Sequence, residues 1–340
     1  MESFKDKKIL IVGGTGTIGK TLVKQTLKEG PKVIRILSRD EHKQFELERY
    51  NEFEDYSKIR FLIGDVRDYD RLERAMNNID VVFNLAAMKH VPSCEYNPDE
   101  AIKTNIIGMQ NVIRAAIKNN VECVLFTSSD KAINPTNTYG ATKMLAEKLV
   151  QAANHSKGNA KTKFVAVRFG NVMGSRGSVI PLFRKQIFDN REITVTDPNM
   201  TRFMMTSEQA IKLLMDVCKI SKGGEVFILK MPVIKLRDLA EIVIEEVKNK
   251  YKINEDINIR EIGLRPGERM YEELMTEDES YKGLDLGNMY VLSNKECSLK
   301  DYSKYFSNIK KCEIQEYSSH KAEVISKELV RKFLLDENII

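Results

Sequence analysis

The segment KILIVGGTGTIGK, residues 8–20, contains the pattern that decides the fold: an apolar run at residues 9–12 and then four glycines within seven positions. Glycine lets a backbone turn tightly and approach a ligand without a Cβ in the way. The helix expected at residues 18–28 would present free N–H groups and the positive end of its dipole to an anion. A strand, a glycine turn and a helix in this order predict a dinucleotide site. The expected contacts are Gly13, Thr15, Gly16, Thr17, Ile18 and Gly19.

Short apolar runs alternate with helix-like stretches through the first half of the chain. The apolar runs are residues 9–12, 33–37, 60–63, 81–85, 123–127 and 164–167. The helical patterns include residues 18–28, 71–77, 99–118 and 138–153. Strands that alternate with helices predict a parallel sheet covered on both faces, with right-handed crossovers. The predicted fold class is therefore α/β, a doubly wound Rossmann sheet.

The alternation loosens after about Gly170. We expect residues 1–170 to form the nucleotide-binding Rossmann domain, with later segments returning to it. Residues 171–340 then form mainly a smaller α/β substrate domain and a C-terminal tail. Ligands of such sheets bind beyond the carboxyl ends of the strands, so we expect the second domain to grow from the loops there.

Composition excludes several classes of protein. The 340 residues are 42% hydrophobic, which is enough for a core. The net charge is +5, but the sequence contains no dense block of basic residues of the kind that binds nucleic acid. The five cysteines and four histidines show no metal-ligand spacing and no CxxC pair, so neither a disulfide framework nor a metal site is expected. No apolar run approaches the roughly 20 residues of a membrane span. A cytoplasmic protein without a signal peptide or membrane anchor is the prediction.

The end of the second strand bears on which dinucleotide is bound. It reads Ser38-Arg39-Asp40, with Lys43 one helical turn further on. An acidic residue here typically holds the ribose hydroxyls of NAD, whereas an arginine accommodates the 2′-phosphate of NADP. Arg39, supported by Lys43, favours NADP because a guanidinium binds phosphate through paired hydrogen bonds. Asp40 keeps NAD possible.

Two motifs coincide beyond the fifth strand. Ser129-Asp130-Lys131 follows the strand, and Tyr139 begins the next helix with Lys143 four residues later. Residues i and i+4 share one helix face, so Tyr139 and Lys143 are expected to point together toward a nicotinamide. A nearby ammonium lowers a phenol's pKa, which would let Tyr139 act as a base. The alternative for Asp130 and Lys131 is a surface ion pair that caps the next helix.

Further motifs are NLAAMKHVP (84–92), SDKA (129–132), RFGNV (168–172), GSRGSVIP (174–181), MTRF (200–203) and RPGE (265–268). With these motifs the chain resembles the nucleotide-sugar branch of the extended short-chain dehydrogenases/reductases. The most similar group is the UDP-N-acetylglucosamine 4,6-dehydratases of polysaccharide biosynthesis. The resemblance is strong over residues 7–275 and looser in the tail.

The resemblance implies a mechanism. Tyr139 takes the proton of the 4-hydroxyl while hydride leaves carbon 4 for the nicotinamide. Lys131 then removes the proton on carbon 5, and Asp130 protonates the departing 6-hydroxyl. Hydride returns to carbon 6, so NADP is regenerated. Relatives with Asp, Lys and Tyr at these positions often invert carbon 5, which is the expectation here.

The resemblance also implies binding residues for the cofactor and for a UDP-sugar. Beyond the glycine turn and the second strand, the cofactor set is Asp65, Val66, Ala86, Ala87, Lys89, Asn105, Tyr139 and Lys143. The substrate set is Lys89, His90, Asn171, Val179, Pro181, Thr196, Arg202, Arg265 and Glu268. Several have an ordinary alternative: a strand-end turn at Asp65, core packing for the aliphatic residues, and a support role for Asn105.

Two other functions remain open. A UDP-sugar 4-epimerase would use the same Tyr139 but would need no acid and base that reach carbons 5 and 6, so the Asp130-Lys131 pair favours the dehydratase. A noncatalytic NADP-sensing module is the third reading, and it would not require Tyr139, Lys143 and Asp130 together. The resemblance alone implies a homo-oligomer.

Overall fold

The computed structural model describes residues 3–50, 52–175, 177–264, 267–293, 302–337 and 339–340. Its strands are β1 (Lys8–Val12), β2 (Val33–Ser38), β3 (Ile59–Ile63), β4 (Val81–Asn84), β5 (Cys123–Thr127), β6 (Lys163–Arg168), β7 (Asn171–Val172), β8 (Glu192–Val195), β9 (Thr201–Met205), β10 (Glu225–Leu229), β11 (Val233–Lys235), β12 (Asn258–Glu261), β13 (Glu273–Met275), β14 (Leu284–Asp285), β15 (Met289–Ser293), β16 (Lys310–Lys311) and β17 (Tyr317–Ser318). Its helices are α1 (Thr17–Lys28), α2 (Glu41–Arg49), α3 (Tyr69–Met76), α4 (Val91–Tyr96), α5 (Pro98–Ile102), α6 (Gly108–Lys118), α7 (Thr138–Ser156), α8 (Val179–Asn190), α9 (Ser207–Ile220), α10 (Leu236–Tyr251), α11 (Glu277–Ser280) and α13 (Lys327–Asp336). Shorter turns are η1 (Tyr56–Lys58), η2 (Lys103–Ile107) and η3 (Asp130–Ala132).

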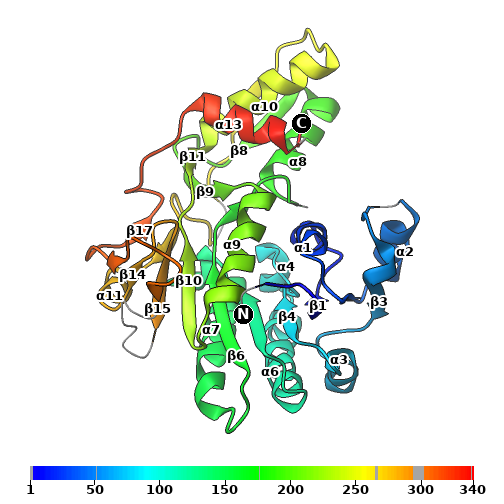
Figure 1. The fold of residues 1–340 in the computed structure, drawn as a ribbon. Helices are drawn as coiled ribbons and strands as arrows, with labels where there is room; N and C mark the ends of the chain where they lie inside the picture. Colours follow the sequence, from blue (N-terminus) through cyan, green and yellow to red (C-terminus); the bar gives the residue numbers. More distant parts are fainter. Residues whose placement is uncertain (1–2, 51, 176, 265–266, 294–301, 338) are drawn as a thin grey trace.

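A ten-stranded sheet forms the centre of the molecule, with the order β16-β14-β15-β10-β6-β5-β4-β1-β2-β3 (Figure 1). The strands from β10 to β3 in this order are parallel to one another. Strand β15 pairs antiparallel with β10 and extends the sheet on that side. The winding direction reverses between β1 and β4, which leaves a crevice at the carboxyl ends of these two strands. The predicted α/β, doubly wound fold is confirmed.

Helices cover the sheet on both faces. Helix α1 packs against α9, whereas α3, α6 and α7 pack in sequence with one another. Strands β4 and β5 are buried at every position, as expected for a sheet with two covered faces. The first six strands begin and end within one residue of their predicted bounds.

The helix predicted at residues 99–118 is present, but a π-helical turn interrupts its α-helical hydrogen bonding. Helix α5 gives way to the π-helical turn η2, and α6 continues from Gly108. The turn contains Asn105, whose side chain hydrogen-bonds both Met88 N and Met88 O. A π turn inserts one residue into a helix and often lies at a functional site. Here it directs an amide toward the loop that follows β4.

Two large hydrophobic cores organise the described part of the chain, beside a small cluster that contains Tyr139. The larger core joins the central sheet to its covering helices. The smaller core lies among α8, β8, α10 and α13, which occupy the upper end of the molecule in Figure 1. The chain passes between the cores more than once, because α9, β10 and β15 return to the large sheet after β8 and β9 have contributed to the smaller core.

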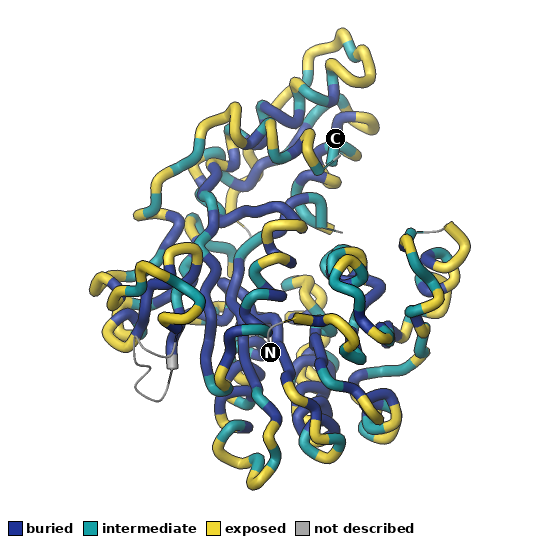
Figure 2. The backbone as a smooth tube through the Cα atoms, in the orientation of Figure 1, coloured by how far each residue is buried: buried dark blue, intermediate teal, exposed yellow. Residues whose placement is uncertain are grey.

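Burial follows the same plan. The central strands form a continuous buried layer, and exposed positions gather on the outer surfaces of helices and at loop tips (Figure 2). Among the residues that the structure describes, none of the helices combines the length and apolar character that a membrane crossing demands. The cytoplasmic location stays a prediction.

Candidate active site

A cavity of about 580 Å³, called the cleft below, lies where the loops after β4, β5 and β6 meet α8, β9 and the loop at residues 267–273. Many predicted site residues line it: Ile18, Ala87, Lys89, His90, Asp130, Lys131, Tyr139, Lys143, Asn171, Val179, Thr196, Arg202 and Glu268. The remaining cofactor residues lie outside this lining: most are on the glycine turn, the start of α1 and the strand ends, whereas Lys43 lies in α2 and Asn105 in η2. Pro181 is exposed on α8 and does not line the cleft, and Arg265 lies outside the described residues.

The Asp130–Lys131 pair lies in η3, directly after β5. Ser129 caps this turn, because its Oγ accepts a hydrogen bond from Lys131 N at 3.3 Å. Lys131 Nζ donates to Asp130 Oδ2 at 2.8 Å, and the Asp130 side chain is only 4% exposed. A carboxylate this buried differs from that of an ordinary surface ion pair. Asp130 and Lys131 therefore line the cleft as a hydrogen-bonded ion pair.

A second buried carboxylate, Glu272, faces the same ammonium. Glu272 Oε1 lies 3.6 Å from Lys131 Nζ and 3.5 Å from Arg202 Nε. Burial alone would lower the pKa of Lys131, but the negative charges of Asp130 and Glu272 outweigh it and raise that pKa. Burial and the nearby Asp130 raise the pKa of Glu272 itself. Lys131 is therefore an ammonium at neutral pH in this structure and must lose a proton before it can act as a base.

Tyr139 lies in the first turn of α7 and points toward this pair. Asn137 caps the helix through a hydrogen bond that Gly140 N donates. Burial raises the pKa of the Tyr139 phenol to about 12, whereas the Lys131 charge and a hydrogen bond with Ser129 oppose that rise. The Lys131 ammonium is thus a cationic neighbour of the phenol.

Lys143 is buried one turn further along α7. Its Nζ donates to Thr127 O at 2.7 Å and lies 4.6 Å from the centre of the Phe126 ring. Burial lowers the pKa of Lys143 to about 7, since the ammonium has a carbonyl and a ring beside it but no carboxylate. The side chain lines the cleft.

The glycine turn fits a dinucleotide. Gly13 has φ +82°, and a Cβ there would lie 2.9 Å from Ala86 N. Only glycine therefore fits this position without strain. A Cβ on Gly19 would lie 2.5 Å from Gly14, which keeps α1 close to the turn. No side chain caps the start of α1, whose N–H groups suit a pyrophosphate. In the cleft beyond it, the buried hydroxyl of Ser128 lacks a hydrogen-bond partner within the described residues, as a group that meets a ligand would.

At the end of β2, the Arg39 side chain is exposed to solvent, whereas Ser38 and Asp40 interact with other residues of the protein. Ser38 Oγ lies 2.8 Å from Thr15 Oγ1. Asp40 caps α2 by accepting from Lys43 N at 3.0 Å, and its carboxylate also pairs with the Lys43 ammonium. Asp40 is therefore already bound within the protein, whereas the Arg39 side chain is 57% exposed and lies 3.6 Å from Asp65.

Three predicted residues serve the neighbouring loops. Asn105 Nδ2 donates to Met88 O and Thr142 Oγ1, and Asn105 Oδ1 accepts from Met88 N, so this amide braces the loop after β4. Val66 packs against Gly108, where a Cβ would lie 2.8 Å from its Cγ1. His90 begins α4, and its ring fills the space that a Cβ on Gly177 would need.

Arg202 and Asn171 lie on the side of the cleft formed by β7 and β9. Arg202 donates to the carbonyls of Thr201, Arg269 and Met270, and Nη2 lies 3.6 Å from Glu268. Its guanidinium thus holds the loop at residues 267–273 against β9. Asn171 Nδ2 donates to both oxygens of Glu272 at 2.9 Å, and Glu272 Oε2 also accepts from Phe203 N.

Two site residues were missed from the sequence. Ser129 stood directly before the chosen pair, so a signal existed. Glu272 follows the RPGE motif by four residues, but that region contains several acidic side chains and nothing in the pattern distinguishes this one. Its carboxylate accepts hydrogen bonds from Asn171 of β7 and Phe203 N of β9, which hold it beside Lys131.

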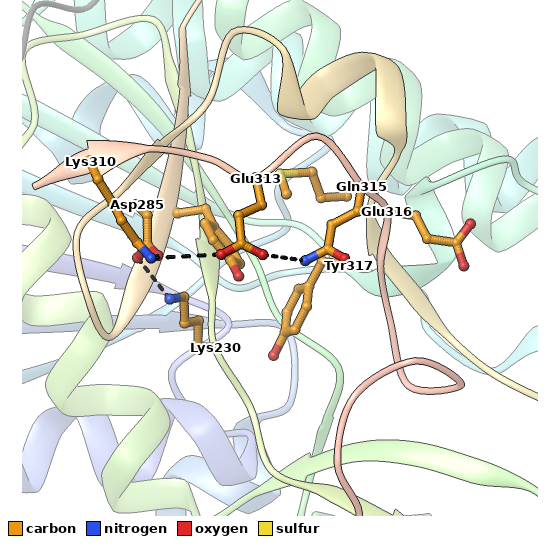
Figure 3. Close-up of a pocket in the computed structure, with 9 residues that line it drawn as sticks. Lys230, Asp285, Lys310, Glu313, Gln315, Glu316 and Tyr317 are labelled. Carbon is orange, nitrogen blue, oxygen red and sulfur yellow. Dashed lines mark hydrogen bonds and ion pairs between the residues drawn. The ribbon is translucent and has the colours of Figure 1, made fainter.

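A second hollow, of about 210 Å³, lies away from the cleft beside β14 and β15 (Figure 3). Lys230 donates to Asp285 at 2.7 Å, and Lys310 reaches Asp285 and Glu313. Gln315 donates to Glu313 at 3.2 Å. Lys230, Lys310, Asp285 and Glu313 therefore interact with one another, and they join the segment at residues 310–317 to the sheet edge.

Comparison with known proteins agrees with this fold. A family model described as polysaccharide biosynthesis protein matches residues 9–294. The chain therefore belongs to this family, among the nucleotide-sugar dehydratases and epimerases of the extended short-chain dehydrogenase/reductase class.

Individual relatives have different names. The chain is 45% identical to a UDP-N-acetylglucosamine 4,6-dehydratase (inverting) of Campylobacter jejuni, over 85% of this chain and 84% of the relative. It is 41% identical to a UDP-glucose 4-epimerase of Rickettsia bellii, over 98% and 96%. An uncharacterized membrane protein of Methanocaldococcus jannaschii is 50% identical over 97% and 96%. The X-ray structure of Pen from Bacillus thuringiensis has 53% identity, a TM-score of 0.91 and 99% coverage of both chains.

Proposed function

We propose that the protein is an NADP-dependent UDP-N-acetylglucosamine 4,6-dehydratase that inverts carbon 5 and serves surface glycan biosynthesis. One observation carries the proposal: a buried Asp130 carboxylate and the Lys131 ammonium are joined at 2.8 Å in the cleft that Tyr139 also lines. Oxidation at carbon 4 needs only a phenol, whereas elimination across carbons 5 and 6 needs an acid and a base as well. The word "inverting" in the names of two relatives supports the stereochemistry.

Each of three side chains has one task in this proposal. When bound, the nicotinamide supplies the hydride chemistry, by accepting hydride from carbon 4 and returning it to carbon 6. Tyr139 accepts the proton of the 4-hydroxyl. Lys131, once neutral, takes the proton on carbon 5, which the neighbouring ketone makes acidic. Asp130 gives a proton to the 6-oxygen, which leaves as water.

The binding residues divide between the two sides of the cleft. The glycine turn and α1 would hold the pyrophosphate, and Arg39 would hold a 2′-phosphate because Asp40 is committed to Lys43. Lys143 would hold the nicotinamide ribose. Asn171, Arg202 and Glu268 would bind the UDP-sugar, with Thr196 and Val179 nearby. Residues 1–170 and the segments that return to their core thus form the NADP side, and the smaller core supports the UDP-sugar side.

A UDP-sugar 4-epimerase is the second candidate. It is favoured by relatives of that name which match 98% of the chain. Such an enzyme would use Tyr139 and leave Asp130 and Lys131 without a chemical role.

Proton NMR of UDP-N-acetylglucosamine with the enzyme and NADP in D₂O tests the proposal. A new methyl signal from carbon 6 is expected, with deuterium at carbon 5. A galacto-configured sugar without that methyl would establish the epimerase. An unchanged sugar spectrum and unchanged absorbance would contradict both functions.

A further inference from the structure

The guanidinium of Arg168 is buried between two carboxylates. Arg168 ends β6, and its side chain is only 4% exposed. Its Nη2 and Nε donate to the two oxygens of Glu147 at 2.6 and 2.9 Å, and Nη1 and Nη2 each donate to Glu279 at 2.7 Å. Burial alone would lower the pKa of Arg168, but the two carboxylates outweigh it and raise that pKa. Arg168 is therefore a permanent cation inside the protein.

Glu147 lies on the same face of α7 as the catalytic motif. It follows Lys143 by four residues, as Lys143 follows Tyr139, so the three side chains project from one side of the helix. The Glu147 side chain is 1% exposed, and both of its oxygens accept hydrogen bonds from Arg168. A buried carboxylate without a partner is costly, and a lysine one turn away on the same helix is within its reach. Arg168 thus occupies the one acidic side chain of α7.

Lys143 is left to groups of a different kind. Its Nζ donates to Thr127 O at 2.7 Å and lies 4.6 Å from the centre of the Phe126 ring, both on β5. Arg168 faces the same side of the sheet, because Phe126 pairs with Ala166 and Arg168 follows Ala166 by two positions. Among the described residues, no carboxylate binds the Lys143 ammonium. The ammonium therefore stays at the end of β5, where the side chain lines the cleft.

Lys131 shows what carboxylates do to a buried lysine in this protein. Burial favours the neutral form of both lysines. For Lys131 the charges of Asp130 and Glu272 outweigh burial and raise the pKa, whereas for Lys143 burial acts without them and lowers the pKa to about 7. If Glu147 lost its cation, it would bind the Lys143 ammonium in the same way and draw it along α7, away from the cleft.

We infer that Arg168 positions Lys143 for the cofactor by keeping Glu147 bound, so that the ammonium remains at the end of β5 and can meet the nicotinamide ribose. The inference rests on the cofactor role proposed for Lys143 above. Arg168 does not line the cleft, so it acts through Lys143 and is a positioning residue. Its contribution is a positive charge that Glu147 would otherwise take from Lys143.

Removing one or both members of the Arg168–Glu147 pair tests the inference. Arg168→Met leaves Glu147 without its cation, so calorimetry should show NADP bound about 10–150-fold more weakly, the value of one charged hydrogen bond. In the cofactor-free protein, NMR of lysine labelled with ¹³C at Cε, assigned with Lys143→Arg, should show the pKa of Lys143 raised from about 7 toward the ordinary lysine value of about 10.4. Arg168→Met/Glu147→Leu removes both charges and should restore the NADP affinity and the low pKa, since apolar residues can replace a buried ion pair.

Either of two results would overturn the inference. A folded Arg168→Met variant with native NADP affinity and a Lys143 pKa of about 7 would show that the freed Glu147 takes up a proton and leaves Lys143 in place. A double variant that binds NADP no better than Arg168→Met would show that the pair only holds α7 against β6, because a purely structural contact is not recovered by removing its second half.

Arg331 provides the matched control. Its guanidinium also binds two carboxylates, Glu245 and Glu246 of α10, but it lies in α13 and not beside the cofactor residues. Arg331→Met breaks these ion pairs and should leave NADP binding unchanged. A loss of NADP affinity equal to that of Arg168→Met would show that the effect is general destabilisation and not the release of Glu147.

A milder pair of variants covers the case in which Arg168→Met fails to fold. Arg168→Gln can still donate a hydrogen bond to Glu147 but leaves its charge uncompensated, so it should bind NADP more weakly than Arg168→Gln/Glu147→Gln. Equal affinities would contradict the inference. Native protein that binds neither NADP nor NAD would instead refute the proposed function, and a Lys143→Met variant with native NADP affinity would refute the cofactor role of Lys143, so the failures are distinguishable.

Discussion

Replacing Lys131 with arginine separates the two roles of the ammonium. Arginine remains charged at any usable pH, so it can still face Asp130 and Glu272, which lie 2.8 and 3.6 Å from Nζ in the native protein. It cannot take the proton from carbon 5. Loss of a general base lowers a rate by about 10²–10⁴-fold, which is about 2.7–5.4 kcal/mol of activation free energy. Lys131→Arg should therefore retain the fold and the oxidation at carbon 4 but nearly abolish elimination.

The assay follows both half-reactions. Absorbance of the reduced nicotinamide should rise on addition of UDP-N-acetylglucosamine and persist, while proton NMR shows no methyl product. Lys131→Met is the comparison, because it leaves the buried Asp130 without its cation and removes one of the two cations that face Glu272. Breaking a buried pair costs about 3–5 kcal/mol, and we expect the lower end since the Lys131 side chain is 33% exposed. If Lys131→Arg turned over within tenfold of the native enzyme, Lys131 would not be the base.

Three further predictions concern pH and the cofactor. Asp130 and Glu272 raise the pKa of Lys131, so the neutral form of Lys131 becomes more abundant as the pH rises. Because this neutral form is the base, kcat/KM should increase with pH across the neutral range, and a flat profile would exclude this titration. Gly13→Ala should abolish NADP binding in calorimetry, because its Cβ meets the neighbouring backbone at 2.9 Å; Gly158→Ala, with a similarly positive φ but open space around it, should bind normally. Arg39→Ala should weaken NADP binding by about 10–150-fold, from the 1.5–3 kcal/mol of a charge-assisted hydrogen bond, and should leave NAD binding little changed; equal effects on both cofactors would show that Arg39 does not hold the 2′-phosphate.

The parallel sheet could be predicted from the sequence because its signals are local. Each central strand is a short run of apolar residues, and buried parallel strands require this on both faces. The ends of each strand depend on the same residues, so the predicted and observed strand bounds agree closely. The helix at residues 98–118 was predicted but its π turn could not be, because the turn depends on what Asn105 contacts, and Met88 is far from it in sequence.

The catalytic motif was likewise local, whereas its electrostatics were not. Tyr139 and Lys143 share a helix face, as spacing required, but the motif spacing does not show that Lys131 also lies near the phenol. That proximity depends on η3 folding back against the start of α7, which brings Lys131 to Tyr139. Glu272 lies 141 positions after Lys131 in the chain, so only tertiary structure could assign it to the site.

The passage of the chain between its two cores has a consequence for how the molecule can be divided. A fragment that stops at residue 170, where the sequence pattern changes, would leave β6 without β10 and α1 without α9. The bare edge of β6 would be a template for association with other chains. We therefore expect that residues 1–170 do not fold as an independent module, and that exchanging the remaining residues between relatives would require several simultaneous junctions.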